Sequence, residues 1–199
     1  MPKGFQDHEK QEIEQQLIEV GKEFFSTFGL KKTSIAQLTE AVGIAQGSFY
    51  IFFSSKEELY FHVLEKEEEL LKQKLFNELN QVPMTKAKFQ QFLLKAIHYV
   101  EQNSFMKRIY LTNELELIMR KLPKEKIQEH IQKDEKELLP LIQKWQQEGV
   151  MINEDPNVIT ALIRTFMTIT IHKREIGEDM YERTVELLAD SIASKLFEG

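Results

Sequence analysis

The chain of 199 residues contains no cysteine and has only 8 glycines and 5 prolines. The lack of cysteine excludes disulfides, thiolate metal sites and cysteine nucleophiles. So few glycines and prolines argue against an all-β or loop-rich fold. No apolar run approaches the roughly 18 residues that mark a membrane-spanning helix, and the N-terminal stretch lacks the apolar core of a signal peptide. We therefore expect a helical, cytoplasmic protein without a membrane partner.

The chain also lacks an excess of positive charge. The net charge is −6, and residues 1–56 contain 6 lysines against 7 acidic residues. The first arginine of the chain is Arg108. Such counts do not favour a protein that binds nucleic acid, so any such function has to depend on where the lysines lie. Lys31, Lys32 and Lys56 flank residues 33–55.

The segment from Thr33 to Gly43 has the pattern of a short helix with a defined start and end. Thr33 and Ser34 stand where a helix cap belongs, and Gln37 follows Ser34 at the spacing of a capping box. Apolar residues then recur at steps of three and four, at Ile35, Leu38 and Val42. Gly43 lies where the helix must end and where a residue with positive φ is needed.

A second short helix is predicted from Gln46 to Phe52. We expect Phe49 to point inward, whereas Gln46, Ser48 and Tyr50 are available to face outward. Two helices joined by a turn of three or four residues form a helix-turn-helix. The second helix of such a unit enters the major groove of DNA.

The run GIAQGSFYIFFSSKEEL, from Gly43 to Leu59, resembles the signature of the tetracycline-repressor (TetR) family of one-component bacterial regulators. The resemblance covers roughly residues 13–64 and includes the Phe49–Tyr50 pair. It implies that Tyr50 and Lys56 contact DNA phosphates. The full predicted DNA-binding set consists of Thr33, Ser34, Ala45, Gln46, Gly47, Ser48, Tyr50 and Lys56.

The segment also departs from the family's pattern. Thr39 stands where a small alanine often lies at the crossing of the two helices. Ala45 stands where a capping hydroxyl, worth about 1 kcal/mol, is common. Ile51 and Phe52 replace the more polar or larger aromatic residues that often follow the tyrosine.

The second helix contains no arginine, so the bidentate contact of arginine with guanine is absent. Gln46 is suited to adenine, and Ser48 to several base edges. Ile44, Ala45 and Gly47 offer apolar contacts to thymine methyl groups. We therefore expect operator half-sites with A·T character.

The rest of the chain predicts further helices and no strand. They are expected at residues 11–28, 56–79, 86–102, a segment ending at 120, 123–148 with a kink at Pro140, 156–175 and 179–197. The fold class is therefore all-α, with about nine helices in an N-terminal helix-turn-helix domain of three helices and a C-terminal helical bundle. We place a DNA-binding domain at residues 1–55 and an effector-binding and dimerisation domain at residues 56–199.

The predicted helix that starts at Pro156 is apolar on nearly every side. Such a helix is buried all round, most simply by pairing with a second subunit. The last two helices and their symmetry mates would form a four-helix interface, as in the resembled family. A two-fold homodimer implies a pseudo-palindromic DNA operator.

Aromatic and polar residues of the C-terminal part are candidates for an effector cavity between helices. The predicted ligand-binding set consists of Phe92, Tyr99, Met106, Tyr110, Asn113, Glu114, Trp145 and Phe166. The alternative for most of the apolar members is ordinary core packing. No GxSxG, P-loop or paired catalytic constellation occurs, so we expect no enzyme activity, no cofactor and no metal.

Together these patterns predict a homodimeric repressor that leaves its operator when an apolar small molecule binds. Two alternatives stay open. One is a DNA-binding protein of the same fold that answers a protein partner, or nothing. The other is a helical enzyme or adaptor that does not bind DNA and whose helix-turn-helix match is accidental.

Overall fold

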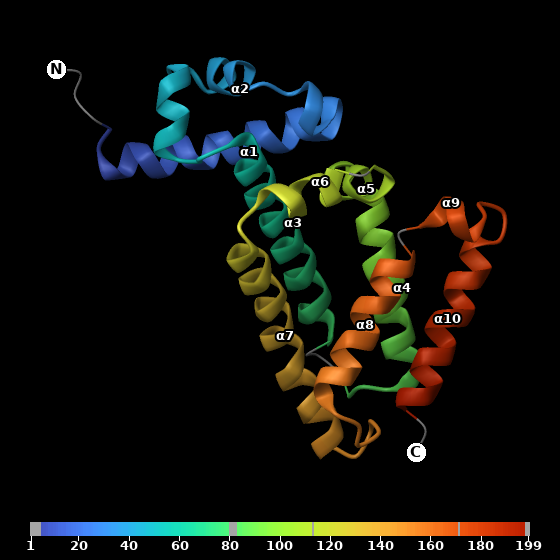
Figure 1. Ribbon diagram of the computed structural model, residues 1–199. Coiled ribbons are helices and arrows are strands. Elements are labelled where there is room, and N and C mark those ends of the chain that lie inside the picture. Colours follow the sequence, from blue (N-terminus) through green and yellow to red (C-terminus); the bar gives the residue numbers. More distant parts are fainter. Residues whose placement is uncertain (1–4, 80–82, 113, 171, 198–199) are drawn as a thin grey trace. The chain divides into compact units, whose positions relative to one another are not determined.

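The computed structural model describes residues 5–79, 83–112, 114–170 and 172–197, and all regular structure in these ranges is helical (Figure 1). The prediction of an all-α fold is therefore confirmed. The helices are α1 (Asp7–Lys32), α2 (Ile35–Val42), the 3₁₀-helix η1 (Gln46–Ile51), α3 (Lys56–Leu79), α4 (Lys86–Gln102), α5 (Ser104–Leu111), α6 (Glu114–Lys121), α7 (Lys124–Gln147), α8 (Pro156–Thr170), α9 (Lys173–Ile176) and α10 (Tyr181–Leu196).

The chain packs as two compact units. The first unit consists of Met1–Glu69 and Ser104–Pro123, and the second consists of Leu70–Asn103 and Lys124–Gly199. The first unit thus combines the N-terminal helices with α5 and α6, which come from the middle of the chain. The predicted division into a DNA-binding domain at residues 1–55 and an effector-binding and dimerisation domain at residues 56–199 concerns function, not packing, and stays a prediction.

Helix α1 is longer than the predicted residues 11–28. It begins at Asp7 because Gln6 and Glu9 form a capping box, in which the Gln6 N–H donates to Glu9 Oε2 at 2.7 Å. At the other end Gly29 interrupts the helical backbone, with φ 80° and ψ 171°. The chain then returns to helical conformation as far as Lys32, so the interruption is a kink and not the end of the helix.

Two other predicted helices are divided in the structure. The segment expected to end at residue 120 forms two helices, α5 and α6. The helix expected at 156–175 ends at Thr170, and α9 follows as a separate short helix. The last carbonyls of a helix have no N–H donor within the helix. At the end of α8 the hydroxyl of Tyr181 supplies such a donor, because it donates to the Thr170 carbonyl at 2.8 Å.

The second unit has a core of aromatic and aliphatic side chains. Phe89 of α4 is fully buried, with its ring centroid 6.1 Å from that of Trp145 on α7 and 5.2 Å from that of Phe197. Helix α4 packs against both α8 and α10, and α7 packs against α8 (Figure 1). None of the described helices is long and apolar enough to cross a membrane.

Helix ends in this unit follow local capping rules. Thr85 caps α4 by accepting the N–H of Lys88 at 3.3 Å. Asp155 precedes Pro156, the first residue of α8, and its carboxylate accepts the N–H of Asn157 at 2.9 Å. Helix α7 runs on through Pro140.

Candidate nucleic-acid interface

The link between α1 and α2 is built by two adjacent hydroxyl residues with different tasks. Ser34 is the N-cap of α2, and the predicted capping box is confirmed: the Gln37 N–H donates to Ser34 Oγ at 3.2 Å, and the Ser34 N–H donates to Gln37 Oε1 at 2.9 Å. Thr33 instead caps the C-terminus of α1, where its buried hydroxyl donates to the Gly29 carbonyl at 2.8 Å.

The turn after α2 depends on Gly43, which adopts the left-handed conformation with φ 79° and ψ 28°. The predicted need for glycine at this position is confirmed. Thr39, which is larger than the alanine common at the helix crossing, leaves no polar group without a hydrogen-bond partner. Its side chain is buried, and its hydroxyl donates to the Ile35 carbonyl at 2.9 Å.

The second helix of the motif is η1, a 3₁₀-helix of six residues. Phe49 anchors it, because this side chain is fully buried and its ring centroid lies 5.9 Å from that of Phe53. Tyr50 is 58 % exposed and Gln46 is exposed as well, whereas Ser48 is only partly exposed. The predicted orientation is therefore confirmed for Phe49, Gln46 and Tyr50.

A shallow hollow of about 450 Å³ lies between η1 and the α1–α2 link. Five residues of the predicted DNA-binding set line it, namely Thr33, Ser34, Gln46, Tyr50 and Lys56. Lys31 and Lys32, both exposed, add positive charge to its wall. Ala45, Gly47 and Ser48 belong to η1 and its start but do not line the hollow. Hydroxyls, lysines and a helix N-terminus around one hollow are the groups that bind phosphate oxygens.

Lys56 has a structural role that the sequence did not reveal. Its half-buried ammonium donates to the Leu30 carbonyl at 2.7 Å and to the Thr33 carbonyl at 2.8 Å. A cation at the C-terminal end of α1 is favourable for the helix dipole, and the two bonds tie the start of α3 to the α1–α2 link. Contact of Lys56 with a DNA phosphate stays a prediction.

The start of α3 is capped by two serines in place of one. Ser55 Oγ accepts the N–H of Glu58 at 3.1 Å, as the capping-box pattern predicts. The Glu58 carboxylate, however, accepts the N–H of Ser54 at 2.7 Å. The reciprocal bond of the box is thus displaced by one residue.

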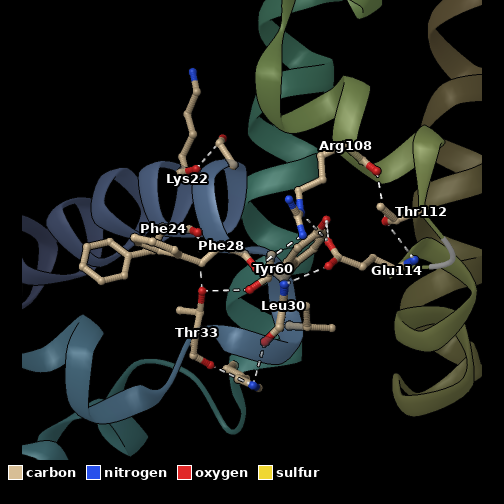
Figure 2. A network of polar contacts seen from close by, with 12 residues as sticks. Lys22, Phe24, Phe28, Leu30, Thr33, Tyr60, Arg108, Thr112 and Glu114 are labelled. Atoms are coloured by element: carbon tan, nitrogen blue, oxygen red, sulfur yellow. Dashed lines mark hydrogen bonds and ion pairs between the residues drawn. The ribbon is translucent and has the colours of Figure 1, made fainter.

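Glu114 of α6 lies at the centre of a polar network that holds the end of α1 (Figure 2). Its buried carboxylate accepts the N–H of Leu30 at 3.1 Å and the hydroxyl of Tyr60 at 3.0 Å. Arg108 Nε forms an ion pair with the same carboxylate at 3.5 Å, without a hydrogen bond. Arg108 also donates through Nη2 to the Phe28 carbonyl at 3.3 Å. Sequence reasoning placed Glu114 in an effector cavity, but its carboxylate already has these three partners.

Tyr60 is fully buried in this network. Its ring lies between Phe25 of α1 and Phe105 of α5, with 4.8 Å between ring centroids in each pair. Burial raises the pKa of the Tyr60 hydroxyl well above its ordinary value, and the neighbouring Glu114 carboxylate raises it further. The phenol is therefore neutral and serves as a hydrogen-bond donor.

Gly29 leaves the space that the network occupies. A Cβ atom at this position would lie far inside van der Waals contact with the Arg108 guanidinium and the Glu114 carboxylate. The positive φ of Gly29 also disfavours any other residue. Glycine is thus required both for the kink in α1 and for the approach of the two charged side chains.

The eight predicted ligand-binding residues are divided between the two units. Met106, Tyr110, Asn113 and Glu114 belong to the first unit, although Asn113 lies outside the described residues. Phe92, Tyr99, Trp145 and Phe166 belong to the second unit, where all except the half-buried Tyr99 are buried members of the core. A cavity that uses these residues stays a prediction. In the described ranges, no three histidine or acidic side chains are placed to hold a metal ion.

Comparison with known proteins gives a consistent result. Residues 17–63 match the family model of bacterial regulatory proteins of the tetR family. A search of curated proteins by sequence gives no match. Among solved structures, a TetR-family transcriptional regulator from Pectobacterium atrosepticum is similar, with a TM-score of 0.72, 20 % identity and coverage of 96 % of this chain and 93 % of that chain.

Two further structures extend the comparison. RolR in complex with resorcinol has a TM-score of 0.63 and 16 % identity, and covers 96 % of this chain and 98 % of that chain. SmeT is the repressor of the Stenotrophomonas maltophilia multidrug efflux pump SmeDEF. Its structure has a TM-score of 0.65 and 13 % identity, and the match covers 92 % of this chain and 89 % of that chain. The matched N-terminal domain carries the helix-turn-helix, and the shared fold extends over almost the whole chain. Residues 17–63 therefore carry the sequence pattern of the tetR family of bacterial regulatory proteins, and the chain as a whole shares the fold of TetR-family transcriptional regulators.

Proposed function

We propose that the protein is a homodimeric repressor that binds a pseudo-palindromic operator and is released from it by an apolar small molecule. In this proposal residues 1–55 bind DNA, and residues 56–199 bind the effector and form the dimer. The observation that carries the DNA-binding part is the hollow beside η1. Positive charge from Lys31 and Lys32 meets the capped N-terminus of α2 and the exposed hydroxyl of Tyr50 there.

The hollow is suited to the sugar-phosphate backbone, while the outer side of η1 is suited to base edges. Phosphate contacts fix the position of a protein on the duplex, and base contacts in the major groove give specificity. The cap at Ser34 leaves the remaining N–H groups at the start of α2 available to an anion. Only a few lysines take part in each subunit, so we expect affinity to fall only moderately as salt rises.

Apolar side chains on the last helices support the homodimer. On α8, Val158 is 53 % exposed and Ile169 is 46 % exposed, and on α10 Leu187 is 50 % exposed. A helix with an apolar outer side is buried in the functional assembly, and a second copy of the same helices would cover these side chains symmetrically. The two recognition segments would then face successive major grooves.

The shared fold and the aromatic core of the second unit support the effector part of the proposal. The fold is shared with RolR, which has been solved with resorcinol bound, and with the repressor SmeT. An aromatic core around Phe89 and Trp145 is the kind of interior that accepts apolar ligands between helices. Release requires that the ligand binds the DNA-incompetent form more tightly, and DNA must then weaken ligand binding by the same factor.

Fluorescence anisotropy tests the DNA-binding proposal. The purified protein is titrated onto the DNA upstream of its own gene and onto a scrambled duplex, over a series of salt concentrations. We expect selective binding to the upstream DNA and a large loss in the Tyr50→Ala, Lys31→Ala double variant. A matched control is Lys195→Ala, which removes a lysine from α10, in the second unit. Equal, weak binding of wild type and double variant to both duplexes would contradict the proposal for this DNA.

A further inference from the structure

The recognition segment lacks charge. The range from Ala45 to Phe53 contains no aspartate, glutamate, lysine, arginine or histidine. Positive charge for phosphate binding must therefore come from the neighbouring lysines, and base recognition must come from neutral groups. The base-edge contacts open to neutral side chains are hydrogen bonds and apolar contact with the methyl group of thymine.

The 3₁₀ geometry of η1 separates its side chains into distinct rows. With three residues per turn, side chains three positions apart lie in one row. Phe49 points inward and is fully buried, and Tyr50 lines the basic hollow. By spacing, Ile51 falls in the third row together with Ser48, one of the predicted base-contacting residues. Ile51 does not line the hollow.

Ile51 is 58 % exposed although it is a β-branched aliphatic residue. It is the last residue of η1, and the buried Phe49 and Phe53 on either side of it hold this part of the chain in place. Ile44, which the sequence offered as another apolar contact, is only partly exposed. Ile51 thus presents the larger free aliphatic surface on the segment that enters the groove.

We propose that Ile51 is a specificity-determining residue that packs against the methyl group of a thymine in each operator half-site. This inference rests on the DNA-binding function proposed above and adds the chemical identity of one recognised base. Cytosine and uracil lack this methyl group, so a thymine is preferred at the contacted position. Burial of one methyl group corresponds to about fourfold in affinity for each contact.

The test uses DNA from which the methyl group alone is removed. Fragments bound by the full-length wild-type protein are first selected from a random library, and the best duplex is resynthesised with deoxyuridine in place of each thymidine in turn. Binding is measured for wild type and for Ile51→Ala. We expect one thymine per half-site where deoxyuridine weakens wild type about fourfold and Ile51→Ala hardly at all. The Met119→Ala variant truncates an exposed apolar residue on α6 and should keep the wild-type pattern.

The outcomes separate this inference from the proposed function. If the wild type selects DNA but deoxyuridine has no effect at any position, or has equal effects in wild type and Ile51→Ala, Ile51 does not read a methyl group. If the wild type selects no sequence over scrambled DNA, the proposed function fails and this inference fails with it. Since Ile51 is largely exposed, Ile51→Ala is expected to fold as the wild type does, and equal unfolding curves verify this.

Discussion

Replacement of Gly29 by alanine should destabilise the protein far more than an ordinary surface substitution. The backbone at Gly29, with φ 80° and ψ 171°, lies in a region that glycine alone occupies readily, and strain there costs about 1–3 kcal/mol. The new Cβ would also displace the Arg108 guanidinium and the Glu114 carboxylate. The Leu30 N–H and the Tyr60 hydroxyl would then lose their shared acceptor, at about 1–3 kcal/mol for each buried donor.

Together these effects predict a loss of about 3–9 kcal/mol, a large part of the roughly 5–15 kcal/mol by which a typical domain is stable. Urea unfolding followed by circular dichroism measures the loss, at one fixed protein concentration for all variants. Two other glycines supply matched controls. Gly149 has a φ of 71° but open space around a new Cβ, so Gly149→Ala measures the strain of a positive φ without the clash. Gly47 has open space and no positive φ, so Gly47→Ala should change stability by less than about 0.5 kcal/mol.

The comparison with Gly149→Ala tests whether the network around Glu114 stabilises the protein beyond the effect of backbone strain. If Gly29→Ala costs no more than Gly149→Ala, the network around Glu114 does not hold the end of α1. A cost that exceeds the strain control, together with weaker DNA binding, would show that the network also positions the α1–α2 link. The DNA measurement is made well below the midpoint of unfolding, so that loss of folded protein does not contribute.

Three further predictions follow from the same geometry. Ser34→Ala removes the cap of α2 and should cost about 1 kcal/mol in urea unfolding, and no change in the midpoint would argue against the cap. Lys31→Gln should weaken DNA binding and lower the salt slope by about 1 with unchanged stability, whereas Lys56→Gln should also lower stability because its ammonium holds two carbonyls. Burial raises the pKa of Tyr181 to about 12 from its ordinary value of 10, so the unfolded chain releases this proton first. Its contribution to stability is therefore complete below pH 10 and is lost as the pH rises toward 12, and a Tyr181→Phe variant should show a weaker decline in alkaline unfolding curves.

Features that depend on near neighbours in the chain were predictable from the sequence. The capping box at Ser34 and Gln37, the left-handed Gly43 and the buried Phe49 each require only residues within one or two helical turns. The helix at 86–102 was predicted with its observed ends, because Asn103 follows it directly. Local hydrogen bonding and hydrophobic period decide such features.

Features that depend on distant residues were not predictable in this way. Glu114 and Leu30 are 84 positions apart, and no local pattern marks their contact. The same holds for Lys56, whose position in the first turn of α3 is unfavourable for that helix but favourable for the end of α1. One signal was available: a glycine next to a helical pattern indicates a close approach by some other group as much as a helix end.

The central claim is that two copies of the η1 segment read DNA from adjacent major grooves. Hydroxyl-radical footprinting on the DNA fragment that the protein selects most strongly tests it most directly. The account predicts two protected blocks related by two-fold symmetry, with centres separated by about 10 base pairs or a multiple of this spacing, and loss of both blocks in the Tyr50→Ala, Lys31→Ala variant. A single block, or protection that persists in this variant, would contradict the account.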